Sequence, residues 1–144
     1  MANKFHKSFY IIKNKAKYIG RRQPICRSSW ESTFCIFLDN HPSVLQWASE
    51  SVAIPYRDPL TNKEKRYYPD FFMVYVDAMG QKHAELIEIK PASQTGQKKT
   101  KSKLNNAQII KNHAKWNAAL QYCAKNGIQF RLLTENEIFK AGKK

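Results

Sequence analysis

Apolar side chains recur at helical spacing early in the chain and at strand spacing soon afterwards. The pattern predicts a helix over residues 28–38, which ends before Pro42. Its core-facing positions are Trp30, Phe34 and Phe37. Shorter apolar runs at residues 44–47 and 52–56 are typical of strands. The first third of the chain is therefore expected to be a helix followed by strands.

The second half of the chain contains one long amphipathic segment. A helix is predicted from about residue 104 to 125, and Gly127 follows as its C-terminal cap. A strand at 128–133 and a short helix that begins at Thr134 come next. The apolar side of the long helix is expected to hold Ile109, His113, Trp116, Leu120 and Cys123. This order of elements predicts an α/β fold, with one mixed central sheet flanked by helices on both faces.

Two strand-like runs in the middle of the chain predict a β-hairpin. They span residues 67–72 and 85–91, and Gly80 in the turn between them can adopt a positive φ. If residues 78–80 form a three-residue loop, Asp77 faces Gln81. This pairing fixes the register of the whole hairpin.

The register brings charged residues together inside otherwise apolar strands. Counting from the turn places Asp70 opposite Glu88, and Lys90 shares a face with Glu88 because side chains alternate. Directly opposed Cβ atoms lie roughly 4.5–5.5 Å apart, so the two carboxylates repel unless a cation lies between them. We interpret the pair as a site for a divalent metal ion. The alternative is an ordinary surface ion pair between Glu88 and Lys90.

Glu31 is the third candidate carboxylate, and two interpretations are open for it. Ser28-x-x-Glu31 matches a capping box, in which Glu31 accepts a hydrogen bond from the backbone N–H of Ser28. Glu31 also lies beside Phe34 and Cys35 on the helix surface, which places it against the sheet and within reach of the metal site.

The charge balance indicates a polyanionic partner. Lys and Arg number 25 against 11 Asp and Glu, a formal net charge of +14, so DNA or RNA is the first expectation and an anionic membrane the second. The three cysteines are odd in number and widely spaced, which is typical of reduced thiols in the cytosol. No apolar stretch suits a signal peptide or a membrane span. We expect a protein that is not secreted, with no membrane partner.

The basic residues gather in three places, each with a candidate role in DNA binding. They are an N-terminal arm at about residues 1–27, a loop at about 92–103 that we expect to be mobile, and one stripe of the long helix. Their candidate DNA contacts are Arg21, Arg22, Arg27, Lys98, Lys99, Lys101, Lys103, Gln108, Lys111 and Lys115. A frayed terminus and a solvated helix face are the alternatives for the arm and the stripe.

These residues resemble the PD-(D/E)XK nuclease superfamily. Glu31 on a first helix, Pro69-Asp70 at a strand start and Glu88-Ile89-Lys90 on the next strand follow its motif, and the elements follow its restriction-endonuclease-like αβββαβ core. The chain resembles more closely the head completion nucleases of T-even-type tailed phages, which are related to the endonuclease subunit of heteromeric transposases. The segments that carry this likeness are Arg27-Ser28-x-Trp30-Glu31, Trp47-Ala48-Ser49-Glu50, Ile54-Pro55-Tyr56, Tyr68-Pro69-Asp70-Phe71, residues 85–91 and Ala114-Lys115-Trp116.

The resemblance implies one nuclease domain over residues 1–144 that cuts DNA with a metal ion. It assigns catalysis to Glu31, Asp70, Glu88 and Lys90, with the three carboxylates holding Mg²⁺ and Mn²⁺ expected to substitute. Mg²⁺ prefers oxygen ligands, and the backbone carbonyl of Ile89 is a further expected ligand. Lys90 would orient a water molecule or offset negative charge on the phosphorus.

The family also implies a place of action. The protein would act on packaged DNA ends before tail attachment, in the virion or in the host cytoplasm, in contact with proteins of the phage head or neck. A transposase-like or repair endonuclease, and a DNA-binding structural protein without catalysis, are the alternatives. The sequence indicates no particular oligomeric state.

Overall fold

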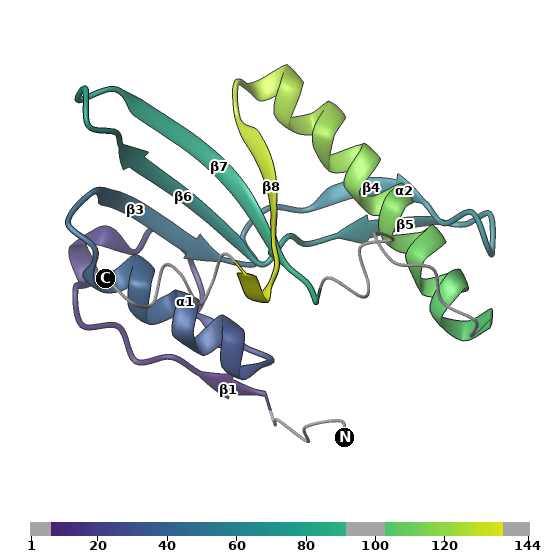
Figure 1. The fold of residues 1–144 in the computed structure, drawn as a ribbon, viewed down its shortest axis with the longest axis horizontal. Coiled ribbons are helices and arrows are strands. Elements are labelled where there is room, and N and C mark those ends of the chain that lie inside the picture. The colour runs from purple at the N-terminus through teal and green to yellow at the C-terminus, as the bar shows by residue number, and fades with distance from the viewer. Residues whose placement is uncertain (1–6, 92–102, 137–144) are drawn as a thin grey trace.

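The central sheet of the protein has four strands, and three of them come from the middle of the chain (Figure 1). The computed structural model describes residues 7–91 and 103–136. The strands β3 (Val44–Ser49), β6 (Phe71–Val76), β7 (Lys82–Ile89) and β8 (Gln129–Leu133) lie in the order β3-β6-β7-β8. β6 is antiparallel to both β3 and β7, whereas β7 and β8 are parallel. The mixed sheet expected from the sequence is confirmed.

One helix covers each face of this sheet, because neighbouring residues of a strand point to opposite sides. Ile87 of β7 belongs to the core under α1 (Ser29–Asn40), together with Phe34 and Leu38. Its neighbour Leu86 belongs to the core under α2 (Lys103–Asn126), together with Trp116. α1, β3, β6, β7, α2 and β8 thus form the αβββαβ core of a restriction-endonuclease-like fold.

A separate two-stranded sheet interrupts this core between β3 and β6. It consists of β4 (Ile54–Arg57) and β5 (Glu64–Tyr67), and it packs against α2 through Ile54, Tyr56 and Tyr67. The single strand expected over residues 67–72 is therefore wrong. Pro69 has no N–H with which to continue a ladder of hydrogen bonds, so the strand is interrupted there. β5 ends at Tyr67 and β6 begins at Phe71.

The hairpin register expected from the sequence is confirmed. Phe71 pairs with Ile87 and Val76 pairs with Lys82, and the backbone N–H of Asp77 donates to the carbonyl of Gln81 over 2.9 Å. Gly80 has a φ of +81° in the turn. Extending this pairing by one residue places Asp70 opposite Glu88.

The buried stripe of α2 differs in part from the expected one. Trp116 and Cys123 are buried as expected, but Leu120 is 52% exposed and His113 also faces solvent. Asn112 and Ala119 are buried instead. Spacings of four, three and four residues along 112, 116, 119 and 123 define a stripe that is rotated around the helix from the expected one, and on this side α2 contacts both the β4–β5 sheet and the central sheet. No helix in residues 7–91 and 103–136 is long and apolar enough to cross a membrane.

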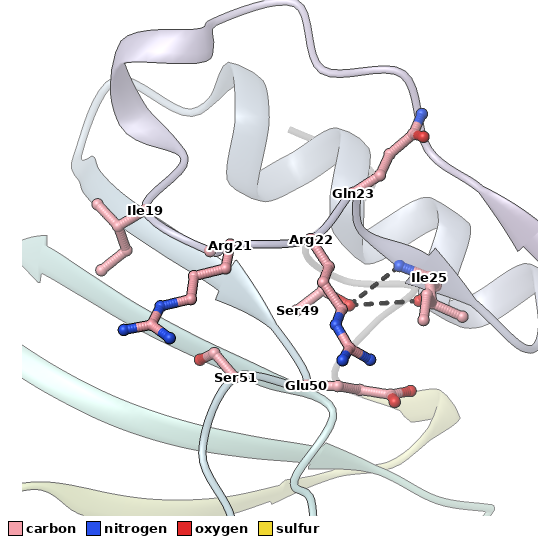
Figure 2. A pocket seen from close by; sticks show the side chains of 9 residues that line it. Ile19, Arg21, Arg22, Gln23, Ile25, Ser49, Glu50 and Ser51 are labelled. Carbon is pink, nitrogen blue, oxygen red and sulfur yellow. Dashed lines mark hydrogen bonds between the residues drawn. The ribbon is translucent and has the colours of Figure 1, made fainter.

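The part of the N-terminal arm that the structure describes is folded onto α1 and β3, so a frayed terminus is excluded from residue 7 onwards. It contains β1 (Ser8–Phe9), the 3₁₀ helix η1 (Lys15–Lys17) and β2 (Ile25–Cys26). Beyond η1 the chain passes along β3 and borders a pocket there (Figure 2). The cysteines Cys26, Cys35 and Cys123 are free, as expected, and all three are buried.

Asp39 of α1 anchors this arm. Its carboxylate is fully buried and accepts hydrogen bonds from the Tyr10 hydroxyl (2.7 Å) and from the backbone N–H groups of Lys13 (2.8 Å) and Asn14 (3.0 Å). Lys17 Nζ donates to the Asp39 carbonyl at 3.0 Å. Burial raises the pKa of Asp39, but the hydrogen bonds outweigh it and hold the pKa below its ordinary value.

We predict that Asp39→Ala lowers the free energy of unfolding by roughly 2–3 kcal/mol, because it orphans several buried donors. Because the pKa is lowered in the folded state, the stabilisation by the ionised Asp39 carboxylate is present at neutral pH. It is lost as the pH falls below about 3.9, the pKa of an aspartate in the unfolded chain. Urea unfolding at pH 7 and at pH 3 measures both effects, with exposed Asn40→Ala as the control. Equal stability of the two variants at pH 7 would contradict the anchoring role.

Candidate active site

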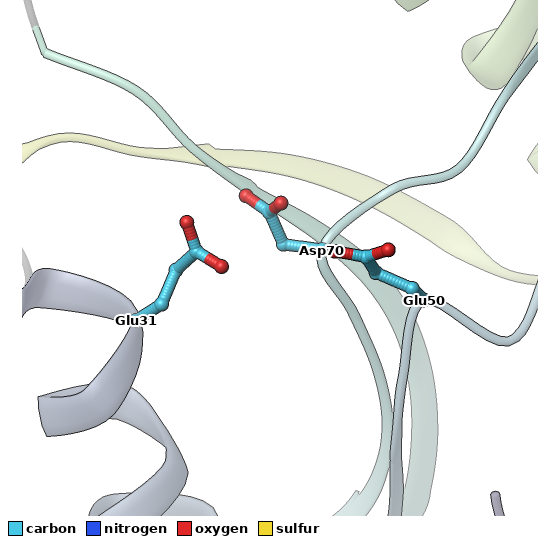
Figure 3. Close-up of side chains that lie close together, drawn as sticks. All are labelled: Glu31, Glu50 and Asp70. Carbon is cyan, nitrogen blue, oxygen red and sulfur yellow. The ribbon is translucent and has the colours of Figure 1, made fainter. Parts of the chain in front are cut away.

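Three carboxylates from three different elements converge at one end of the central strands (Figure 3). Glu31 lies in the first turn of α1, Glu50 directly follows β3, and Asp70 directly precedes β6. One oxygen atom from each of the three lies within 4.8 Å of the other two. We refer to Glu31, Glu50 and Asp70 as the carboxylate cluster.

Asp70 is fixed at both its backbone and its side chain. Its Oδ2 accepts a hydrogen bond from the backbone N–H of Ile89 over 2.8 Å, and its carbonyl accepts one from the N–H of Glu50 over 3.0 Å. The bond from Glu50 continues the β3–β6 pairing by one residue, whereas the pairing of β6 with β7 stops at Phe71 and the Asp70 side chain takes the N–H of Ile89. Asp70 thereby links the ends of β3, β6 and β7.

Glu31 takes part in helix capping and in the cluster at once. The Ser28 hydroxyl accepts from the Glu31 N–H at 3.2 Å and lies 3.3 Å from Glu31 Oε2. Glu31 Oε1 accepts from the backbone N–H of Arg27 at 3.2 Å, rather than from that of Ser28. Only one half of the expected capping box is present, because the Ser28 side chain caps the helix while the Glu31 carboxylate accepts the N–H of Arg27 and faces Asp70.

Glu50 was missed as a candidate ligand by reasoning from the sequence. It has a φ of +46°, a conformation that costs a non-glycine residue about 1–3 kcal/mol and that clusters at functional sites. Arg27 grips its carboxylate with two contacts, Nε to Oε2 at 2.8 Å and Nη2 to Oε1 at 3.2 Å. The one sequence signal that could have identified Glu50 as a candidate is its place in the segment 47–50, because that segment carries part of the family resemblance.

Glu88 and Lys90 lie beside the cluster on the α2 side of the sheet. Glu88 Oε1 accepts a hydrogen bond from the Tyr67 hydroxyl at 2.7 Å, and Lys90 Nζ lies 3.7 Å from Glu88 Oε2. Lys115 Nζ lies over the Tyr67 ring, 5.8 Å from its centroid. The carboxylate of Glu88 is thus directed toward Tyr67 and lies outside the carboxylate cluster.

Burial and mutual repulsion make the ionised carboxylates costly. Burial raises the pKa of Asp70 well above its ordinary range, and the charges of Glu88 and Glu31 raise it further. Burial also raises the pKa of Glu31 and of Glu88, although Lys90 opposes the shift at Glu88. A bound cation would relieve this repulsion, and a donor set of carboxylate oxygens alone suits a hard divalent ion such as Mg²⁺.

The candidate DNA contacts are distributed around this site. Arg21 and Arg22 line the pocket beside Glu50, and Arg27 pairs with Glu50. Lys111 Nζ lies 3.8 Å from the buried Asp58. Gln108 donates to Asn112, and Lys115 lies over the Tyr67 ring. Lys98, Lys99 and Lys101 lie outside the described residues, and Lys103 begins α2.

The αβββαβ core and the acidic residues at its strand ends define a nuclease-like α/β protein. Comparison with protein families agrees, since the family described as TnsA-like endonuclease N terminal matches residues 41–135. The chain belongs to this family. It is similar to the head completion nuclease of Enterobacteria phage T4, with 35% identity over 92% of this chain and 93% of that relative.

We predict that Mg²⁺ or Mn²⁺ stabilises the folded protein by offsetting the repulsion within the cluster. At one hundred times the dissociation constant the gain is about 2.7 kcal/mol, which thermal unfolding detects as a rise of several degrees in Tm. Asp70→Asn should raise Tm without metal and abolish the metal response. Glu64→Gln, which removes an exposed carboxylate of β5, is the matched control. An equal response in the parent and in Asp70→Asn would exclude Asp70 as a ligand.

Proposed function

We propose that the protein is a metal-dependent DNA endonuclease that hydrolyses phosphodiester bonds during phage head completion, on packaged DNA ends before tail attachment. The observation that carries this proposal is the convergence of Glu31, Glu50 and Asp70 beside Glu88 and Lys90. Family membership and the similarity to a head completion nuclease support the same activity.

The metal ion would be held by the carboxylate cluster, and Glu88 would join it as a further ligand by turning its carboxylate from Tyr67 toward Asp70. Glu50 joins the set proposed from the sequence because one of its carboxylate oxygens lies within 4.8 Å of an oxygen of Asp70 and of Glu31. When bound, Mg²⁺ or Mn²⁺ supplies polarisation of a phosphoryl oxygen and a lowered pKa for a ligand water. The hydrogen bond from Ile89 orients Asp70, and the paired contacts of Arg27 orient Glu50.

Lys90 is the proposed source of positive charge at the reacting phosphate. Its ammonium group is held 3.7 Å from Glu88, which is longer than a tight ion pair, so it can turn toward a phosphate or a water molecule. Charge placed in advance where negative charge develops lowers the barrier more in a buried site than in water.

The remaining basic residues would hold the DNA backbone without reading its sequence. Lys111, Lys115 and Gln108 lie along one helix near Tyr67 and Asp58, and the lysines of residues 98–103 would extend this grip. We propose DNA as the main partner, and proteins of the phage head or neck as partners during assembly in the virion or the host cell.

A second candidate activity is that of a transposase-like or repair endonuclease, which the family description favours. The chemistry would be the same and the DNA substrate would differ. Cleavage of free ends, forks, junctions and plain duplex with Mg²⁺ distinguishes the two candidates. A non-catalytic head protein would cut none of them.

We predict that Asp70→Asn and Glu88→Gln each lower the cleavage rate by about a thousandfold or more, because metal catalysis contributes several kcal/mol. Affinity for DNA should persist or rise, since repulsion of phosphate is relieved. Plasmid nicking assays and DNA binding without metal measure the two effects, with Glu64→Gln as control. Full turnover in either purified variant would remove the metal-site argument.

We predict that Lys90→Ala lowers kcat by about 10²–10³-fold with little change in KM, as expected for a charge needed in the transition state. Lys82→Ala, at the other end of β7 and exposed, is the control. Steady-state kinetics with Mg²⁺ measures kcat and KM separately. A raised KM with unchanged kcat would make Lys90 a phosphate contact instead.

A further inference from the structure

The pocket between the N-terminal arm and the end of β3 is a candidate binding site that adjoins the carboxylate cluster (Figure 2). It has a volume of about 310 Å³ and is lined by residues 19–23, Ile25 and residues 49–51. This volume lies at the lower end of the range for ligand pockets. Glu50 belongs both to the pocket wall and to the cluster.

Two arginines give this pocket its positive charge. Arg21 and Arg22 extend from the arm toward Ser51 and Glu50 on the opposite wall (Figure 2). Within residues 7–91 and 103–136, no carboxylate lies within ion-pair distance of either guanidinium. The only acidic residue in the wall, Glu50, is already engaged by Arg27. The pocket is therefore suited to an anion.

The lining favours a phosphate over a base. None of the nine lining residues is aromatic, so the pocket offers no ring on which a base could stack. Guanidinium groups present planar donors that match phosphate oxygens. The hydroxyl of Ser51 on the far wall adds a further donor.

The pocket wall is held in place before any ligand binds. The Tyr18 hydroxyl donates to the Arg22 carbonyl at 2.6 Å, and the Ile19 N–H donates to the Trp47 carbonyl at 2.9 Å. A side chain at Gly20 would place its Cβ 2.6 Å from Tyr18 Cζ, so glycine is needed for this close approach. Such preorganisation lowers the cost of binding.

We propose that this pocket binds a phosphate of the DNA strand next to the phosphate at the carboxylate cluster, with Arg21 and Arg22 as its direct contacts. The inference rests on the proposed function in taking DNA as the substrate. It deepens that function, because a second fixed phosphate would set the position of the strand relative to the cluster. The bound group is either an internal diester or a terminal phosphate of the strand.

The test measures DNA binding in the full-length Asp70→Asn protein without metal, so that no cleavage is needed. Arg21→Gln/Arg22→Gln is compared with Lys63→Gln/Arg66→Gln, which removes the same charge from the exposed β4–β5 hairpin. The probes are duplexes of about one helical turn. In each duplex one phosphate is replaced by an uncharged methylphosphonate, or one end carries a phosphate instead of a hydroxyl.

The pocket variant should bind unmodified duplex about tenfold or more weakly, which corresponds to losing about 1.4 kcal/mol, and the control should change much less. Neutralising the contacted phosphate should weaken DNA binding by the parent and by the control but not by the pocket variant, because that variant has already lost the partner of this phosphate. We call this difference coupling. Coupling at an internal position identifies a diester, and coupling at an end identifies a terminal phosphate.

Coupling at no position, or equal losses in the pocket and control variants, would overturn the proposal. The two proposals fail separately. If the wild-type protein, which retains Asp70, cuts no DNA but the coupling is observed, the nuclease function fails and the pocket assignment stands. If the wild-type protein cuts DNA and the pocket variant binds like the control, only the pocket assignment fails.

Discussion

The attachment of Asp70 to both of its neighbouring strands is the constraint on which the arrangement of the site depends. Its carbonyl accepts the N–H of Glu50 after β3, and its carboxylate accepts the N–H of Ile89 at the end of β7. These two bonds fix the ends of three strands relative to one another. They also fix the acid itself, although burial and the charges of Glu88 and Glu31 raise its pKa. The hydrogen bonds thus hold in place a group that the surrounding charges disfavour.

The hairpin and its charged residues could be predicted because their pattern is local. A turn with one glycine sets the register, and the register alone places Asp70 opposite Glu88. The helix at Glu31 was equally predictable from its cap. The break at Pro69 was not predicted, because the aromatic residues on both sides of Pro69-Asp70 are typical of one continuous strand. Glu50 escaped for a related reason: its orientation depends on a positive φ and on Arg27, and neither leaves a periodic signal in the sequence.

The N-terminal arm shows how distant contacts decide what composition leaves open. Its charges alone suit a frayed terminus as well as an arm that contacts phosphate. The buried carboxylate of Asp39 excludes the frayed terminus, because it accepts the backbone N–H groups of residues 13 and 14 just before η1. Lys17, the last residue of η1, completes this anchor by donating to the Asp39 carbonyl. The arm then reaches the cluster as Arg27, whose guanidinium positions Glu50.

The site lies at the end of the sheet because residues from both faces can meet only there. Glu31 comes from the helix over one face, whereas Glu88 and Tyr67 belong to the other. Inside the sheet the backbone separates these groups, and each would pack into its own apolar core. Before β6 the pairing with β7 stops, and Asp70 can face Glu31 while it remains close enough to Glu88 for their charges to interact. The interruption between β5 and β6 therefore gives the carboxylates a common space.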